Sequence, residues 1–196
     1  MEQDKKERLL TAAMKMFAER GFENVSIRQI ANEADLNSAM ISYYFGGKEQ
    51  LFTAVLSRQA KPLVDFSRQD TSHLSTEEVL SKYITIMKEI HHEHPSLGEF
   101  IVQSFTCKTP LYAGFAKKME NVFRLLSQAL QRGIAEGKLR KDLDVKEATI
   151  LLVGMANFHF LTQNFRKQFP IADGQNEDVY MKQALQIFLA GIAKKA

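Results

Sequence analysis

The chain has little of several things that fix the class of a protein. Cys107 is the one cysteine in 196 residues, which excludes an internal disulfide framework and favours a reducing compartment. Tryptophan is absent and proline occurs only four times. No segment alternates polar and apolar residues in the β-branched pattern of strands. Leu, Ala, Met, Gln, Glu and Lys dominate instead, so the sequence predicts an all-α protein.

Long apolar runs are also missing. The most apolar segment, 150–161, is interrupted by Asn157 and His159 and is too short to span a bilayer. The first six residues, MEQDKK, contain no apolar signal core. We therefore expect a cytoplasmic protein with no membrane partner.

The charge of the chain permits nucleic acid as a partner without arguing for it. The net charge is +3, and apolar residues make up 45% of the chain, enough for a sizeable core. The first fifty residues hold seven Lys and Arg against eight Asp and Glu. Any affinity of this region for DNA must therefore come from the placement of its side chains.

Three helices with clear start and stop signals are predicted near the N-terminus, at 5–20, 27–34 and 38–45. The first is followed by Gly21, which suits the left-handed end of a helix. Ser26 and Gln29 form a capping box at the start of the second. Asp35 suits a turn, and Asn37 is a good N-cap for the third.

Two short helices joined by a tight turn, and preceded by a supporting helix, predict a helix-turn-helix domain at 1–47. Its expected core is Ile27, Ile30, Ala31, Leu36, Ile41 and Phe45. A helix cannot bury three consecutive residues on so small a core, so Tyr43 or Tyr44 should face outward. Residues 48–196 are predicted to form a larger helical domain. It should contain helices that begin at 48, kink or stop near Pro62, and continue at 76–93, 95–105, 110–135, 144–169 and from 176, about nine in the chain.

The first fifty-odd residues resemble the TetR family of transcriptional regulators. The resemblance lies in LLTAA at 9–13, FAERGF at 17–22, SIRQIA at 26–31 and SYYFGGKEQLF at 42–52. Asp35 stands where the family usually has Gly, Ala39 where Gly is frequent, and Ser42 where Tyr is usual. The first departure should strain the turn slightly, and the other two should alter which operator is recognised.

The resemblance implies a repressor that binds palindromic operator DNA as a dimer. The residues expected to face the major groove are Ser38, Ala39, Met40, Ser42 and Tyr43, and those expected at the phosphates are Tyr43, Tyr44, Lys48, Ser26 and Arg28. Few bidentate base contacts are expected, because the middle of the reading helix has no Arg or Asn.

The resemblance also implies that residues 48–196 bind a small effector and dimerise through the last two helices. Segment 150–161 is apolar nearly all round, which suits a helix covered on both faces, and the stripe Met181, Ala184, Leu185, Phe188 and Leu189 in the last helix matches it. An apolar or amphipathic effector is expected. The candidates for its pocket are Phe105, Tyr112, Phe115, Met119, Phe123, Phe158 and Phe165, with Asn157, His159 or Gln163 orienting the ligand.

Other functions have weaker signals. His91, His92 and His94 could suggest a metal, but a solvated helix end explains them better, and Cys107 is more simply a buried thiol than a redox sensor. No nucleophile–base pair or phosphate-binding Gly loop is present, so neither a cofactor nor catalysis is expected. The alternative kept open is a DNA-bound scaffold of the same fold that recruits a protein partner without an effector.

Overall fold

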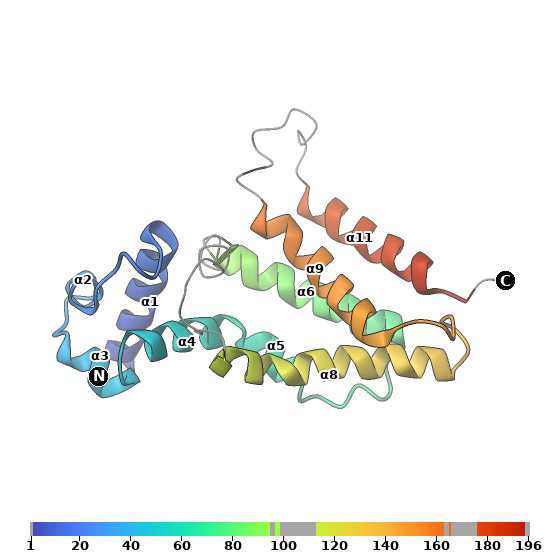
Figure 1. The fold of residues 1–196 in the computed structure, drawn as a ribbon, viewed down its shortest axis with the longest axis horizontal. Coiled ribbons are helices and arrows are strands. Elements are labelled where there is room, and N and C mark those ends of the chain that lie inside the picture. The colour runs from blue at the N-terminus through green and yellow to red at the C-terminus, as the bar shows by residue number, and fades with distance from the viewer. Residues whose placement is uncertain (1, 95–96, 99–112, 163–164, 166–175, 195–196) are drawn as a thin grey trace. The chain divides into compact units, whose positions relative to one another are not determined.

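The computed structural model describes residues 2–94, 97–98, 113–162, 165 and 176–194 (Figure 1). The regular secondary structure of these residues is helical, and one isolated bridge joins Leu139 to Ala193. The nine helices found in this part of the chain are α1 (Glu2–Arg20), α2 (Ile27–Glu33), α3 (Ala39–Phe45), α4 (Lys48–Gln59), α5 (Lys61–Phe66), α6 (Thr76–Glu93), α8 (Ala113–Ala135), α9 (Val145–Leu161) and α11 (Glu177–Ile192). The all-α prediction is therefore confirmed.

Most helix boundaries follow the local signals in the sequence. The 76–93 helix is confirmed at both ends, and α11 begins directly after its cap, Asn176, whose side chain accepts from the backbone N–H of Asp178 and Val179. α4 ends at Gln59 and α5 begins at Lys61, so Pro62 lies in the first turn of a new helix, where its missing N–H does no harm. The helix predicted at 144–169 is shorter, since α9 ends at Leu161. The segment predicted at 95–105 lies largely outside the described residues.

The chain divides into two compact units, one formed by Met1–Lys61 with Glu93–Lys118 and the other by Pro62–His92 with Met119–Ala196. In the first unit α1 packs against α2 and α4, and α3 packs against α2 and α4. α4 is thus part of the packing of the N-terminal helices. The functional boundary predicted between residues 47 and 48 stays a prediction.

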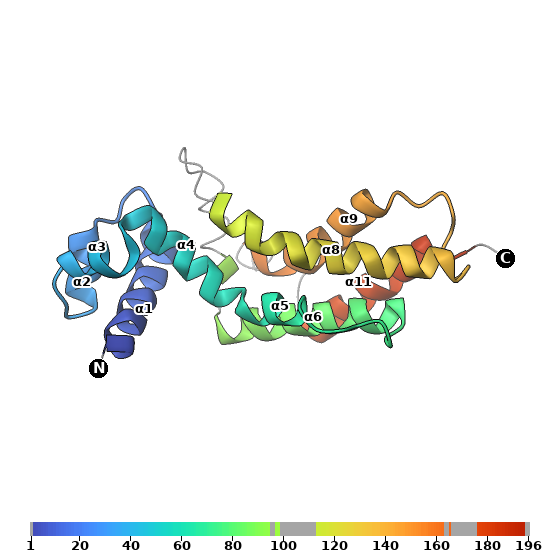
Figure 2. The same ribbon diagram turned by 90° about the horizontal axis from the view of Figure 1, so that it is seen from below.

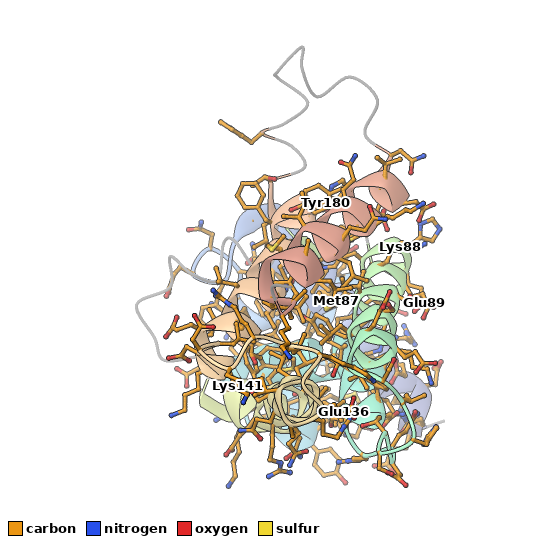
Figure 3. All side chains as sticks on the ribbon, turned by 90° about the vertical axis from the view of Figure 1, so that its right-hand side faces the viewer. Met87, Lys88, Glu89, Glu136, Lys141 and Tyr180 are labelled. Atoms are coloured by element: carbon orange, nitrogen blue, oxygen red, sulfur yellow. The ribbon has the colours of Figure 1, made fainter. Side chains whose placement is uncertain are left out.

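The second unit contains α6, α9, α11 and most of α8, seen from two directions in Figures 1 and 2. α9 and α11 pack side by side, and the phenol of Tyr180 on α11 donates to the carbonyl of Met155 on α9 at 2.8 Å. α6 is tied to α11 by Lys88, whose ammonium lies 2.7 Å from the carboxylate of Asp178 (Figure 3 labels Lys88 and Tyr180). In the described part of the chain, no helix combines the length and apolar character needed to cross a bilayer.

One close approach fixes the end of α8 against α6. A methyl group placed on Gly133 would lie 2.7 Å from Leu139 Cδ1 and 2.8 Å from Thr76 Oγ1. The hydroxyl of Thr76 donates to the carbonyl of Ala129 at 2.8 Å. An alanine at this position would force Leu139 or Thr76 to shift, so glycine lets the α8 backbone, the Leu139 loop and the start of α6 meet closely.

Candidate nucleic-acid interface

A small aromatic core supports the N-terminal helices. Phe17 on α1, Phe22 after it and Phe52 on α4 are all buried, with ring centroids 5.2–5.6 Å apart. Such tilted and edge-to-face pairs are the preferred geometries of aromatic rings. Ile30 and Ile41 are completely buried in the same unit. The N-terminal helices α1–α4, called the head below, therefore have a core of their own, against which α2 and α3 pack.

The expected core of α2 and α3 is only partly correct. Ile30, Ala31 and Ile41 are buried, whereas Ile27, Leu36 and Phe45 are half-buried. A Lys6 ammonium lies 5.7 Å from the centre of the Phe45 ring. Three side chains at the edge of this small unit thus keep contact with solvent, because too few neighbours are available to cover them.

α2 starts and ends on strong local signals. The predicted capping box is confirmed: Ser26 Oγ accepts from Gln29 N at 3.2 Å, and Gln29 Oε1 accepts from Ser26 N at 2.8 Å. At the other end, Leu36 N donates to Ala31 O at 2.9 Å and Asp35 N to Asn32 O at 3.0 Å. These two bonds form a Schellman motif, with Asp35 in the left-handed conformation at φ 50°.

α3 follows this turn directly. The side chain of Asn37 accepts from Ala39 N at 2.8 Å, so Asn37 supplies the capping bond as predicted, and the helix begins one residue later than expected, at Ala39. Gly46 ends α3 with φ 85°, and its N–H bonds to Ser42 O. α3 is therefore held at its start by a side-chain cap and at its end by a left-handed glycine.

The face of α3 opposite Ile41 is open to solvent. Tyr43 is 76% exposed, Ala39 and Ser42 are exposed, and Met40 and Tyr44 are half-buried. The rings of Tyr43 and Tyr44 meet edge to face at 5.0 Å. The expectation that one of the paired tyrosines faces outward is thus confirmed by Tyr43.

Tyr44 remains a hydrogen-bond donor at neutral pH. Partial burial raises the pKa of its phenol, and the carboxylate of Glu2 and the neighbouring Tyr43 raise it further. A neutral phenol can donate to a phosphate oxygen, whereas a phenolate would be repelled by it.

The other residues expected at phosphates flank this face. Ser26 and Arg28 are exposed at the N-terminus of α2. The ammonium of Lys48, at the start of α4, lies 4.2 Å above the ring of Phe22, a cation–π contact. Ser38 is half-buried and its side chain makes no capping bond. Their contacts with DNA stay predictions.

A short helix that is anchored by one buried face and presents small and polar side chains outward fits a groove about 12 Å wide. A family model for bacterial regulatory proteins of the tetR family matches residues 9–55, which contain α2, α3 and the turn between them. The HTH-type transcriptional repressor NicS of Pseudomonas putida is 27% identical over 184 residues, covering 86% of this chain and 81% of NicS. The chain belongs to the TetR family of transcriptional regulators.

Solved TetR-family structures share the fold along its whole length. HlyIIR, a hemolysin II transcriptional regulator, is 25% identical, with a TM-score of 0.70 and coverage of 100% of both chains. FadR of Bacillus subtilis, solved in complex with stearoyl-CoA, is 18% identical, with a TM-score of 0.78 and coverage of 94% of this chain and 98% of FadR. At this low identity the second likeness shows the fold alone.

The residues expected to line an effector pocket are placed unevenly. Phe105 and Tyr112 lie outside the described residues. Phe115, Met119 and Phe123 are half-buried at four-residue intervals, so they share one face of α8. Phe158 is 56% exposed and Phe165 is 61% exposed. The pocket stays a prediction, and the exposure of Phe158 places its ring on the surface of a single chain.

Two histidines of the second unit are buried. His91 is buried, and its ring stacks on Phe160 with centroids 3.8 Å apart and planes 6° apart. His159 is also buried and lies 4.7 Å from the Tyr180 ring. The interpretation of 91–94 as a solvated helix end is therefore wrong for His91, although His92 is exposed. In the described part of the chain, no group of three or more His, Cys, Asp or Glu side chains is arranged to hold a metal ion.

On α11 the exposed apolar residues are ones that sequence reasoning missed. In the stripe expected on α11, Met181, Ala184 and Phe188 are buried within the chain. The exposed apolar side chains are instead Val179 and Ile187 on α11 and Ile150, Leu151 and Phe158 on α9. The eight-residue spacing of Val179 and Ile187 on a helix was the available signal.

Proposed function

We propose that the protein is a dimeric TetR repressor that binds palindromic operator DNA through α3 and is released by a small apolar or amphipathic ligand. The observation that carries the proposal is the exposed face of α3, which stands on the buried Ile41. The name of NicS, a repressor, supports the sign of regulation.

The chemistry of α3 supports a largely phosphate-based affinity. Ala39 and Met40 offer apolar atoms that suit a thymine methyl, and Tyr43 offers a phenol to a phosphate. No arginine or asparagine lies within α3 to read guanine or adenine bidentately. The affinity should therefore be strongly dependent on salt.

The apolar surface of α9 and α11 supports a second copy of the chain as partner. Leu151 and Ile187 border a groove of about 260 Å³ between the two helices, with Phe188 and Gly191 in its lining. A methyl group added to Gly154 or Gly191 would meet nothing within 4 Å. Open space beside a backbone that is flanked by exposed apolar side chains suits the close approach of a partner helix. Two copies of this face, related by a two-fold axis, would cover each other.

The proposed effector class is supported mainly by a comparison. FadR was solved with stearoyl-CoA, a long acyl chain on a polar carrier. The half-buried face formed by Phe115, Met119 and Phe123 supports a ligand with an apolar part. Release requires that such a ligand bind the free protein more tightly than the DNA-bound protein.

The DNA-binding proposal is tested by selecting bound duplexes from a random pool and measuring their affinity over a range of salt. Tyr43→Ala and Arg28→Ala should weaken specific binding by about tenfold or more, since each removes one phosphate contact from both halves of a dimer. Lys141→Ala removes a positive charge from an exposed loop position and is the matched control. Arg28→Ala should also lower the salt slope by about 1.8, from two lost contacts at about 0.9 each. Unchanged affinity in both variants would contradict the proposal.

The effector is tested by titrating acyl-CoA molecules of increasing chain length against the protein–duplex complex. We expect release at micromolar concentrations for a subset of chain lengths. If no ligand changes the affinity for the duplex, the result would favour the alternative, a DNA-bound scaffold that recruits a protein partner and needs no effector.

A further inference from the structure

The end of α2 leaves two backbone carbonyls without partners inside the helix. In the Schellman motif described above, the carbonyls of Ala31 and Asn32 are used, whereas those of Ala34 and Asp35 point out of the turn. Both are met by one side chain from α1. Arg8 Nη2 lies 2.6 Å from Ala34 O and 3.3 Å from Asp35 O.

The turn that Arg8 contacts is strained by its own sequence. Asp35 has φ 50°, a region that glycine enters freely and that other residues enter only with steric strain. The guanidinium of Arg8 also lies 3.4 Å from the carboxylate of Asp35. That carboxylate is fully exposed, so the ion pair itself contributes little, and the bonds to the carbonyls carry the contact. A cation at the C-terminus of α2 is favoured by the helix dipole as well.

Charged side chains border much of the seam between α1 and the turn. The seam contains an open hollow of about 390 Å³, bordered by Glu7, Arg8, Thr11, Ala12, Lys15, Glu33, Ala34 and Asp35. The pair of Lys15 and Glu33, at 2.6 Å, also crosses this hollow, and Glu33 directly precedes Ala34 in the chain. The carboxylate of Glu7 pairs with the guanidinium of Arg58 on α4, with Nη2 and Oε2 2.8 Å apart, so Glu7 has a partner other than Arg8. Arg8 is therefore the described side chain that joins α1 to the carbonyls of the turn.

From these contacts we infer that Arg8 is a positioning residue for α3. By holding the carbonyls of Ala34 and Asp35 it fixes the left-handed turn, and the turn sets the angle at which α3 leaves α2. Arg8 compensates in this chain for an aspartate at a left-handed position. The inference rests on the proposed DNA-binding function of α3 and adds a residue that acts on DNA only through the turn.

The test compares Arg8→Met and Arg8→Lys with the control Lys15→Met, in the wild-type chain and in the Asp35→Gly chain. Lys15→Met removes a cation from the same hollow but leaves the turn carbonyls bonded. The measurements are affinity for a selected operator, affinity for non-specific duplex, the salt slope and the unfolding temperature. All binding is measured well below the unfolding temperature, so that loss of folded protein does not contribute.

We expect Arg8→Met to weaken operator binding about tenfold, Arg8→Lys to weaken it less, and Lys15→Met to leave it within about twofold. Non-specific affinity and the salt slope should stay unchanged, because Arg8 is not expected to touch a phosphate. Asp35→Gly should restore most of the affinity lost in Arg8→Met, because glycine holds φ 50° without strain.

Three results would overturn the inference. A salt slope lowered by about 0.9 per site would show that Arg8 itself contacts phosphate. A lower unfolding temperature with unchanged operator affinity would reduce Arg8 to a stabilising role. Failure of Asp35→Gly to rescue Arg8→Met would separate Arg8 from the turn. If the wild-type chain binds no duplex specifically, the proposed function fails, which the wild-type measurement reveals before any variant is compared.

Discussion

The N-terminal helices and the last two helices differ in how far their large apolar side chains are exposed to solvent. In α1–α4 the large apolar side chains are buried or half-buried, except for Tyr43 on α3. On α9 and α11 five large apolar side chains are exposed, among them Leu151 at 61% and Ile187 at 67%. In α1–α4 the apolar side chains are thus covered within the chain, apart from the exposed face of α3. On α9 and α11, a single chain leaves apolar side chains uncovered.

The largest expected effect is the loss of dimer affinity when a charge is placed on the exposed apolar face of α9 and α11. Ile187→Asp should raise the dissociation constant of the proposed dimer about a hundredfold or more. A buried isoleucine contributes ~1.5–3 kcal/mol, and a symmetric dimer loses it twice. Sedimentation at several concentrations measures the change. Gln186→Asp, about 100° around the helix, is the control and should leave the dimer intact.

The next largest effect is a loss of stability when the aromatic core of the N-terminal helices is disrupted. Phe52→Ala should lower the free energy of unfolding by about 3–4 kcal/mol, because it removes a buried ring that meets both Phe17 and Phe22. Denaturant unfolding followed by circular dichroism measures it. Phe158→Ala, made in the Ile187→Asp background, should change stability by less than about 1 kcal/mol. Equal losses for the two phenylalanines would erase the contrast between the regions.

Two glycines sharpen the same contrast within the second unit. Gly133→Ala should destabilise the fold by about 1–3 kcal/mol, since the added methyl would meet Leu139 and Thr76 below 3 Å. Gly154→Ala should stabilise the isolated chain by about 0.5–1 kcal/mol, because helix propensity rises and no atom lies nearby. Thermal unfolding below the dimer dissociation constant compares them. A destabilising Gly154→Ala would show that this face is covered within one chain.

The smallest expected effect is a pH dependence of stability, to which both units contribute. A hydrogen bond from Lys15 lowers the pKa of Glu33 in the head, and bonds from the Ser75 backbone and hydroxyl lower the pKa of Glu78 at the start of α6. A lowered pKa in the folded state means that stability is fully present above about pH 4.5 and is lost as the pH falls through the folded value. The unfolding temperature should therefore drop as the pH falls below about 4.5. Glu78→Gln should flatten this dependence slightly, and an unchanged profile would contradict the assignment.

Local signals predicted most of the fold because each acts within a few residues. The Ser26 capping box, the Asn37 and Asn176 caps and the left-handed Asp35 all bond to backbone groups two or three positions away. The exposed Tyr43 also followed from the sequence, because a helical period cannot bury three consecutive residues on a small core.

Only the tertiary structure decided which apolar side chains of α9 and α11 face outward, that His91 stacks on Phe160, and that Arg8 reaches a turn 27 residues later. Segment 150–161 is apolar nearly all round, so its helical period alone leaves the buried face undetermined. The contact of Arg8 depends on how α1 and α2 cross. The sequence by itself determined where helices start and stop, because those bonds are local, while the relative placement of helices depends on packing between residues far apart in the chain.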